Sequence, residues 1–322
     1  MTAPAAPGAA APAGAARVVV ICVPTHRRPK MLGALLEGLG RLAFRGPHPR
    51  ARLVVVDNDP LGSARAVCDA AGPRLGWPLR YVLEPRRGIA VARNTAIREA
   101  GPDADLIAFV DDDEVPDPRW LDELLRVQAS HHADVVAGPA VPQFLPGAPP
   151  WLTRGGPFHR RRYRTGSRPR AVSTNNVLIR REVFARLGGF DERLALIGNE
   201  DRHFFLRARR AGVRIVWADE ALVHEWIPPS RARVRWLLRR KYRSGANTSL
   251  MHELLGASAW RQTLLAAEGC QAIVAGALLI PWAFAAGRPA IVWCLQEICR
   301  GAGMLAGVAG RRYERYRITD GE

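Results

Sequence analysis

Short apolar runs alternate with longer amphipathic segments along the first part of the chain. Four runs of four to six residues have the β-branched character of buried parallel strands: 18–23, 53–56, 79–83 and 106–110. Helical spacing of apolar residues separates them: 29–39, 63–71 and 89–100. Pro29 suits a first helical turn, and Gly72 and Gly101 suit helix ends. This alternation predicts an α/β domain with a mostly parallel sheet and helices on both faces.

The next stretch, residues 139–170, is rich in Pro and Arg and shows no helical or strand pattern. Structure is expected to resume as a strand over 173–179 and a short helix over 181–187, followed by a turn. A helix over 199–211 and a strand over 213–217 then complete the domain.

The composition is that of a folded protein with an appendage. The chain has 322 residues, of which 48% are hydrophobic, enough for one large core and an accessory segment. Residues 1–16 are nearly all Ala, Pro and Gly, so we expect a disordered tail and not a signal peptide. The five cysteines include no Cys-x-x-Cys pair, which favours free thiols in a reducing compartment, with the catalytic part in the cytoplasm.

A formal net charge of +17 calls for an acidic partner, and nucleic acid, anionic lipid and phosphate-bearing substrates all qualify. Much of the charge is arginine in two stretches, 159–170 and 230–243. Arginine on a solvated surface accounts for part of it. The chain has no zinc-finger spacing, RNA-recognition signature or recognition-helix pattern, so we expect no nucleic-acid partner.

Three polar clusters follow the predicted strands directly. They are Pro24 with Thr25, residues 57–59, and the acidic run 111–114. In open α/β sheets ligands bind outside the carboxyl ends of the strands, where loops and helix starts gather. The clusters therefore predict a ligand site at that edge.

The acidic run is costly unless a cation or hydrogen bonds compensate it, because like charges repel. Asp111 and Asp113 are two apart, so in an extended segment they face one side and Asp112 faces away. That arrangement suits Mg²⁺ or Mn²⁺, which take one or two protein carboxylates and fill their shells with water and phosphate. An acidic surface turn is the alternative, but the apolar run 106–110 argues against an exposed loop.

A second acidic pair, Glu200 and Asp201, opens the predicted helix 199–211. Acidic residues at this position often do no more than stabilise the helix terminus. The functional alternative is a general base that accepts a proton from an acceptor hydroxyl. An ordinary Asp pKa of about 3.9 leaves that carboxylate ionised at neutral pH.

Six segments of the sequence form an ordered set of motifs. In chain order they are VVICVPTHRRP, LVVVDNDP, RGIAVARNTAIREAG, FVDDDEVPDPRWL, NNVLIRREVFARLGGFDE and GNEDRHFFLRARRAG. Together they resemble glycosyltransferase family 2 across residues 17–226. The DDDE run with its Trp-Leu pair, and a later Pro-x-Arg-x-Arg segment, also resemble the subgroup that makes succinoglycan-type exopolysaccharide.

The resemblance implies a GT-A nucleotide-diphospho-sugar transferase fold and inversion of the anomeric centre. It also implies roles for individual residues. The residues it places in the nucleotide-sugar site are Pro24, Thr25, Asp57, Arg93, Asp111 and Asp112. Of these, Asp57 would hydrogen-bond the uracil. Asp113 would ligate the metal, with Asp111 on the ribose or the metal's waters, and Asp201 would be the base. Asp57 as a turn residue and Arg93 as a surface cation are the alternatives.

Some positions depart from the family pattern or allow two readings. The usual Gly-Glu-Asp is here Gly198, Asn199, Glu200, Asp201, so Glu200 could serve as the base instead. His224 lies where some relatives place a metal or phosphate contact, although a lone histidine at a strand end is often structural. Asn175 and Asn176 are expected on the acceptor side, or else as buried amides that satisfy backbone groups.

Residues 227–322 are expected to form a basic amphipathic helix followed by an apolar helical, membrane-associated segment. Residues 269–286 carry no charge but contain Pro281, and this length barely crosses a hydrocarbon core of about 30 Å. A second apolar stretch is interrupted by Glu297 and Arg300. The basic stretch before them can lie on anionic lipid. We expect a peripheral or hairpin anchor at the cytoplasmic face of a bacterial inner membrane.

The predicted function is transfer of a sugar, with UDP-hexose as the expected donor, to a hydroxyl of a lipid-linked glycan in cell-surface polysaccharide synthesis. A catalytically silent membrane-attached nucleotide-sugar binder is the first alternative, and a basic nucleic-acid-binding protein is the second. The sequence does not identify the sugar, the acceptor or the linkage, because these depend on pocket shape.

Overall fold

The computed structural model describes residues 17–144, 146–153 and 156–314. The expected tail, residues 1–16, lies outside the described residues, as does the end of the expected membrane segment, 315–322.

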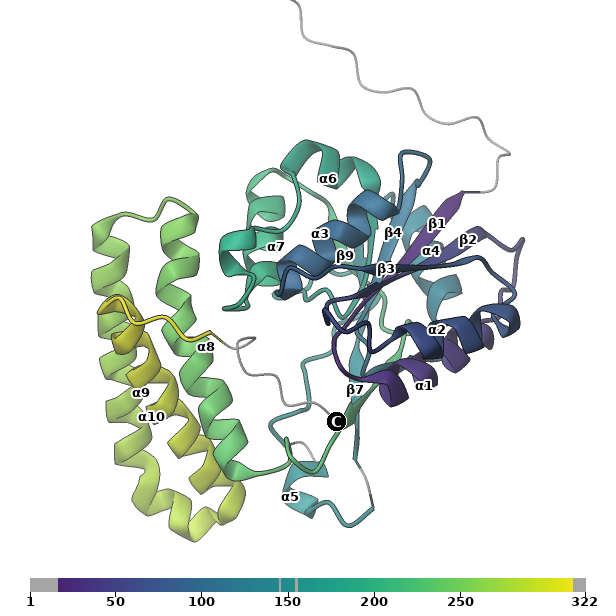
Figure 1. The fold of residues 1–322 in the computed structure, drawn as a ribbon. Helices are drawn as coiled ribbons and strands as arrows, with labels where there is room; N and C mark the ends of the chain where they lie inside the picture. Colours follow the sequence, from purple (N-terminus) through teal and green to yellow (C-terminus); the bar gives the residue numbers. More distant parts are fainter. Residues whose placement is uncertain (1–16, 145, 154–155, 315–322) are drawn as a thin grey trace, which may run out of the picture.

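The centre of the molecule is a seven-stranded sheet in the order β3-β2-β1-β4-β8-β6-β9 (Figure 1). Its strands are β1 (Val18–Thr25), β2 (Arg50–Asp57), β3 (Leu79–Leu83), β4 (Leu106–Val110), β6 (Val135–Ala137), β8 (Asn176–Arg180) and β9 (Ile215–Trp217). Strands β1 to β4 are parallel and β6 is parallel to β9, whereas β8 is antiparallel to both of its neighbours. The mostly parallel sheet expected from the sequence is confirmed.

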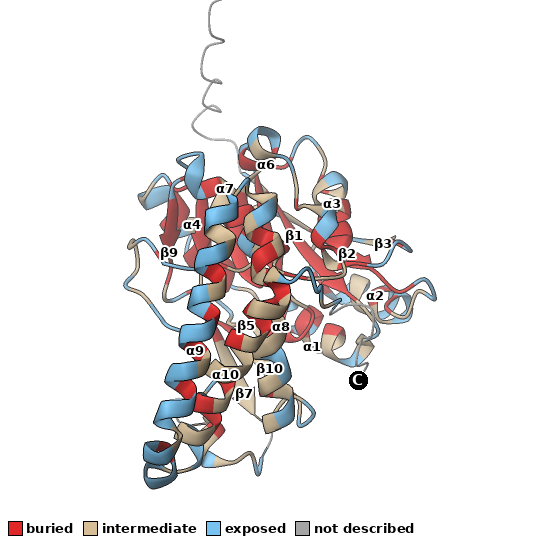
Figure 2. Ribbon diagram, turned by 90° about the vertical axis from the view of Figure 1, so that its left-hand side faces the viewer, coloured by how far each residue is buried: buried red, intermediate tan, exposed pale blue. Residues whose placement is uncertain are grey.

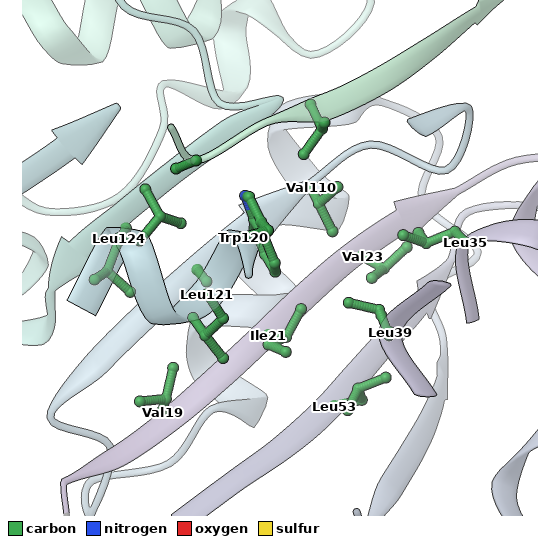
Figure 3. Packing of buried hydrophobic residues seen from close by; sticks show 14 of the residues in the cluster. Val19, Ile21, Val23, Leu35, Leu39, Leu53, Val110, Trp120, Leu121 and Leu124 are labelled. Atoms are coloured by element: carbon green, nitrogen blue, oxygen red, sulfur yellow. The ribbon is translucent and has the colours of Figure 1, made fainter. Parts of the chain in front are cut away.

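Helices cover both faces of this sheet because successive strand residues point to opposite sides. Val19, Ile21 and Val23 pack with helices on one face (Figure 3), and Val20 and Cys22 pack on the other. The first face carries α1 (Pro29–Gly40), α2 (Arg65–Ala71) and α4 (Trp120–Ser130). The second carries α3 (Ile89–Glu99), α6 (Arg181–Leu187) and α7 (Glu200–Arg210). Two short 3₁₀ turns, Gly72–Arg74 and Glu192–Leu194, complete the domain.

A second, three-stranded sheet was not expected. It has the order β5-β10-β7 and contains β5 (Glu114–Pro116), β7 (Ala140–Phe144) and β10 (Val223–Ile227). The stretch 139–170, expected to be irregular, thus holds β7 and the short helix α5 (Pro150–Thr153). Pro142 within β7 hides the strand signal, and only pairing with β10 makes the segment extended. The expected domain boundary after residue 226 falls inside β10.

The C-terminal part forms a helical arm beside the sheet domain (Figure 1). Its helices are α8 (Val234–Leu254), α9 (Ala259–Ala286) and α10 (Arg288–Val308). Helix α10 packs between the other two through glycines. A methyl group at Gly301 would collide with the Gly269 carbonyl oxygen of α9, and one at Gly303 with the Tyr242 carbonyl oxygen of α8. Small residues at these crossings let the backbones approach closely.

The surface of α9 that faces away from the rest of the arm is apolar. Its exposed large side chains include Val274, Leu278, Trp282 and Phe284, and Figure 2 shows the exposed side of α9 facing the viewer. By length and composition, α9 and α10 could each cross a membrane. An exposed apolar surface of this kind indicates contact with lipid or another apolar partner.

Candidate active site

A cleft of about 520 Å³ lies at the carboxyl ends of the central strands, and α8 forms its opposite wall. The expected site residues that line it are Pro24, Thr25, Arg93, Asp111, Asp112, Asp113, Asn175, Glu200 and Asp201. Strand pairing explains the convergence. Thr25 ends β1, and β4 ends at Val110, which pairs with Asn176 at the start of the antiparallel β8. Segments distant in the sequence therefore meet at one edge.

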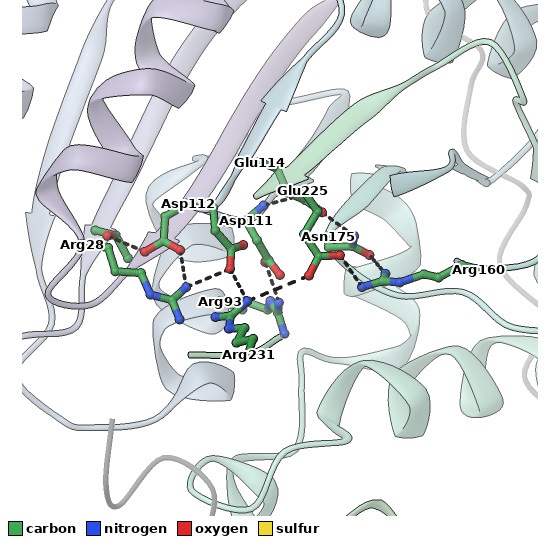
Figure 4. Close-up of polar contacts among 11 residues, drawn as sticks. Arg28, Arg93, Asp111, Asp112, Glu114, Arg160, Asn175, Glu225 and Arg231 are labelled. Atoms are coloured by element: carbon green, nitrogen blue, oxygen red, sulfur yellow. Dashed lines mark hydrogen bonds and ion pairs between the residues drawn. The ribbon is translucent and has the colours of Figure 1, made fainter. Parts of the chain in front are cut away.

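One arginine, Arg28, binds both Asp112 and Asp113; Figure 4 shows Arg28 beside Asp112. Arg28 Nη1 donates to Asp112 Oδ1 at 2.9 Å and to Asp113 Oδ2 at 3.1 Å. Thr25 Oγ1 donates to Asp112 Oδ2 at 2.8 Å, and Arg231 Nη1 donates to Asp113 Oδ2 at 2.8 Å. The expectation that Asp112 faces away from Asp113 is wrong, because residues 112 and 113 form a turn and not an extended segment.

Arg93 on α3 joins the acidic run to the start of α7. Its Nη2 donates to Asp111 Oδ1 at 3.0 Å, and its Nη1 donates to Glu200 Oε1. The side chains of Arg93 and Glu200 are both about 95% buried. The two acidic segments that the sequence singled out are therefore part of one ion-pair network.

The backbone before α7 separates the roles of its two carboxylates. Gly198 and Asn199 both have positive φ, +88° and +69°, a conformation that Gly adopts freely and Asn tolerates. This turn buries Glu200 against Arg93. Asp201 is partly exposed in the cleft, where its Oδ1 accepts a hydrogen bond from the Arg202 backbone N–H at 2.6 Å. Asp201 is the carboxylate open to a substrate.

A further network borders the cleft on the side of the small sheet. Asn175 Nδ2 donates to Glu114 Oε1 at 2.5 Å, and Arg160 Nη1 donates to Asn175 Oδ1 at 3.1 Å. Arg160 Nη2 also donates to Glu225 Oε2 at 2.9 Å. Arg231 links this network to Asp113 through its 3.9 Å contact with Glu225.

Sequence reasoning missed four residues of these networks: Arg28, Arg160, Glu225 and Arg231. Arg28 lies within the first motif segment, Arg160 within the basic stretch 159–170, and Arg231 within the Pro-x-Arg-x-Arg segment. These three arginines lie inside patterns described above, whereas Glu225 lies in none of them. The pattern did not indicate which arginine of a run turns toward the carboxylates.

Asp57 and Asn176 do not line the cleft. Asp57 is fully buried and accepts hydrogen bonds from the Asp59 and Ala64 backbone N–H groups, at 3.1 and 2.7 Å. Its place in the cleft wall is taken by Asn58. Asn176 donates to the Pro139 and Ala221 carbonyl oxygens at 2.9 and 2.7 Å, which is the structural role left open for it.

His224 also points away from the carboxylates. Its Nδ1 lies 2.9 Å from Gln143 Nε2, and its Nε2 lies 3.3 Å from Asp117 Oδ1. Successive residues of a strand face opposite sides, so Glu225 faces the cleft and His224 does not. The structure therefore does not place His224 where it could contact a metal or phosphate in the cleft.

The carboxylates around residue 113 have the chemistry of a divalent-cation site with few protein ligands. Burial, with the nearby charge of Asp113, raises the pKa of Asp112 to about 6 against the opposing effect of Arg28. Burial opposes ionisation of Asp113 as well, but Arg231 and Arg28 lower its pKa. Among the described residues, no three His, Cys, Asp or Glu side chains surround one point. The donors present are carboxylate oxygens, the type of ligand that Mg²⁺ and Mn²⁺ take together with phosphate and water.

Comparison with known proteins identifies the family of this chain. The model for glycosyl transferase family 2 matches residues 20–188, and the model for glycosyl transferase family group 2 matches residues 106–303. The succinoglycan biosynthesis protein ExoM of Rhizobium meliloti is 34% identical over 312 residues, covering 92% of this chain and 94% of the relative. The glucosyl-dolichyl phosphate glucuronosyltransferase of Haloferax volcanii is 26% identical over 255 residues, covering 72% and 76%.

Solved structures share the fold at low sequence identity. The mannosyltransferase PcManGT of Pyrobaculum calidifontis, in complex with GDP-Man and Mn²⁺, superposes with a TM-score of 0.61 at 19% identity, covering 91% of this chain and 87% of that one. S. aureus TarS 1–349 in complex with UDP gives 0.54 at 18% identity, covering 95% of each chain. These neighbours confirm the GT-A fold. On the family match and the 34% identity over nearly the whole chain, the protein belongs to glycosyltransferase family 2.

Proposed function

We propose that the protein is an inverting glycosyltransferase that moves a hexose from UDP to a hydroxyl of a lipid-linked glycan during cell-surface polysaccharide synthesis. One observation carries the proposal: the acidic run after β4 and the acidic start of α7 meet in one cleft, joined by Arg93. A transferase needs both groups there, one at the leaving diphosphate and one at the incoming hydroxyl. Similarity to a succinoglycan biosynthesis protein supports the polysaccharide assignment.

In this proposal the donor nucleotide lies against Pro24, Thr25 and Asn58, at the ends of β1 and β2. Its diphosphate lies near Asp111 and Asp113. A bound Mg²⁺ or Mn²⁺, held by those two carboxylates, would supply electrostatic stabilisation of the leaving diphosphate. UDP is bound in the TarS structure and GDP-Man in the archaeal mannosyltransferase, so a donor panel must contain both nucleotides.

Asp201 acts as the general base. Sugar transfer passes through a state with positive charge on the ring and increasing negative charge on the departing diphosphate. Asp201 accepts the proton of the acceptor hydroxyl as that oxygen attacks the anomeric carbon from the face opposite the diphosphate. This single displacement inverts the anomeric centre. Glu200 is a positioning residue, because it is buried against Arg93 and holds that arginine beside Asp111.

The helical arm would hold the protein at the cytoplasmic face of the membrane as a peripheral or hairpin anchor. Helices α9 and α10 are long and apolar enough to enter a bilayer, and the outward surface of α9 carries large apolar side chains. Such an anchor places the cleft near an acceptor that is itself attached to lipid.

The enzymatic proposal is tested by incubating the full-length protein with radiolabelled UDP-glucose, Mg²⁺ or Mn²⁺ and a bacterial membrane extract. We expect lipid-soluble label that a chelator abolishes and that Asp201→Asn reduces by about 10²–10⁴-fold without loss of donor affinity. Asp69→Asn, the same change at an exposed position on α2, is the control. Other UDP-hexoses and GDP-mannose complete the panel.

Two results would count against this assignment. Donor binding without turnover for every nucleotide sugar supplied would indicate a silent binder. A Glu200→Gln protein that keeps its stability yet loses more activity than Asp201→Asn would transfer the role of base to Glu200.

A further inference from the structure

One side of α8 forms the cleft wall that faces the acidic residues. It carries Trp236, Arg240, Arg243, Ser244 and Asn247, which recur at helical spacing. Asn247 Nδ2 donates to the Ile197 carbonyl oxygen at 2.9 Å, which fixes this side of α8 next to the loop that leads into α7. The basic wall and the candidate base Asp201 therefore border the same space.

The two arginines of this wall are held by aromatic rings. The guanidinium carbon of Arg240 lies 5.4 Å from the ring centre of Trp236, and that of Arg243 lies 5.7 Å from the ring centre of Tyr313. A guanidinium stacked on a ring directs its N–H donors outward at its edge, in a geometry that matches phosphate oxygens. Two such groups one helical turn apart can bind one phosphate or diphosphate group.

Other arginines, outside α8, contact the acidic residues directly. Arg28 and Arg231 contact Asp113, and Arg93 contacts Asp111 and Glu200. The cleft is therefore lined by arginines from several segments, and two of them, Arg240 and Arg243, come from α8.

An apolar cluster connects the α8 wall to the apolar hairpin of α9 and α10. Trp236 stacks on Phe158 with ring centres 5.9 Å apart, in a cluster that also contains Val292 of α10. Next to Val292, Trp293 borders an apolar hollow whose other lining residues are Leu279, Trp282 and Ala290. The cluster itself is buried, and the apolar side chains exposed beyond it are those of the hairpin, including Trp282 and Trp293.

We propose that the cleft-facing side of α8 is the acceptor subsite, and that Arg240 and Arg243 bind the phosphate that joins the acceptor glycan to its lipid. The glycan hydroxyl lies toward Asp201, and the lipid chain lies toward the exposed apolar side chains of the α9–α10 hairpin. This inference rests on the proposed function and names the group by which the acceptor is recognised. The inference also assigns two roles to the basic stretch 230–243, which we expected to lie on anionic lipid. One side of this stretch lines the cleft, so only the remaining side is available to a membrane surface.

The test is calorimetric titration of farnesyl diphosphate, a short isoprenyl diphosphate, into the full-length protein in dodecyl maltoside micelles. Saturating UDP with Mn²⁺ occupies the donor side. We expect binding to the wild type and at least a roughly tenfold loss of affinity in Arg240→Gln/Arg243→Gln, because each removed guanidinium takes charge-assisted hydrogen bonds with it. Arg239→Gln is the matched control, since Arg239 is exposed on α8 and lies outside the cleft lining.

Farnesol and inorganic pyrophosphate identify what the wall recognises. We expect no saturable binding of farnesol and weaker binding of pyrophosphate than of farnesyl diphosphate. Equal affinity for free pyrophosphate would overturn the assignment to a lipid-linked group, and unchanged farnesyl diphosphate affinity in the double variant would overturn the role of the two arginines. UDP binding separates the two proposals: its absence in the wild type counts against the glycosyltransferase function, whereas normal UDP binding without farnesyl diphosphate binding overturns only the subsite.

Discussion

At the scale of single residues, Arg93 determines whether the two acidic segments form one site. It is buried on α3 and contacts Asp111 on one side and Glu200 on the other. A guanidinium can make both contacts because its N–H groups fan out in one plane, whereas the ammonium of lysine is a compact charge. Arg93 therefore couples the integrity of the fold to the geometry of the cleft.

Replacing Arg93 by Met should lower the free energy of unfolding by about 3–5 kcal/mol, because the buried Glu200 carboxylate loses its counter-ion. Arg93→Lys should lie between this variant and the wild type. Urea denaturation followed by circular dichroism measures the change. Arg50→Met, at an exposed position on β2, should change stability little. Wild-type stability of Arg93→Met would show that the network does not support the fold.

Asp113 allows a test of metal binding that is independent of turnover. Asparagine at this position removes a carboxylate charge from the proposed metal site, so the Mn²⁺-dependent part of UDP affinity should disappear. We expect Mn²⁺ to raise UDP affinity at least about tenfold in the wild type and in Asp69→Asn, and to have little effect in Asp113→Asn. Titration of UDP with and without Mn²⁺ gives the comparison. A full Mn²⁺ effect in Asp113→Asn would exclude Asp113 as a ligand.

At the scale of elements, α8 takes part in two structures at once. One side borders the cleft, and the other packs against α10 at Gly303 and Gly307. A methyl group at Gly307 would collide with the Ala246 carbonyl oxygen of α8. The position of the cleft wall thus depends on close packing within the arm.

Gly303→Val should destabilise the arm, because the added side chain has no room against the α8 backbone. Overpacking of this kind typically costs about 1–3 kcal/mol. The melting temperature of the detergent-solubilised protein should fall by several degrees, while Ala285→Val, on the exposed surface of α9, should leave it unchanged. An unaffected melting temperature in Gly303→Val would contradict the close α8–α10 packing.

At the scale of the whole molecule, charge and apolar surface are distributed over different regions. Arginines gather in and around the cleft, whereas large exposed apolar side chains gather on α9 and α10. This division suits a protein that presents an acidic substrate to its cleft while its arm contacts lipid. Under the proposed function, part of the net charge of +17 serves the binding of a phosphate-bearing substrate.

Replacing Leu278 and Phe284 by Glu should release the protein from vesicles of phosphatidylcholine and phosphatidylglycerol. Both side chains are exposed on α9, 75% and 70%, so the change should leave the folded structure intact. Each charge placed in lipid costs about 2.5–3.5 kcal/mol, enough to reduce vesicle binding at least tenfold. Leu61→Glu, at a residue 83% exposed on the sheet domain, is the flotation control. Undiminished flotation of the double variant would show that α9 is not the anchor.

The sequence by itself determined most strands and helices of the central domain, because local periodicity reports which side of each element is buried. It did not indicate the helix α4 or the strand β6 between residues 120 and 137. It also determined where the chemistry lies, since acidic residues directly after a buried strand can only emerge at its carboxyl end. The six ordered segments then gave the family, and with it the GT-A fold that the structural neighbours confirm.

Only the tertiary structure decided which side chains meet. Asn58 and not Asp57 lines the cleft, and Glu225 and not His224 faces it, because a turn or a strand pairing sets the direction of each side chain. The sequence also did not distinguish the roles of individual arginines. A run such as 230–243 shows a high charge, but it does not show which residues contact a carboxylate, line the cleft or face a membrane. The packing of α8 and the pairing of β10 determine which way these side chains point. Both depend on contacts between segments distant in the sequence, so neither produces a local sequence pattern.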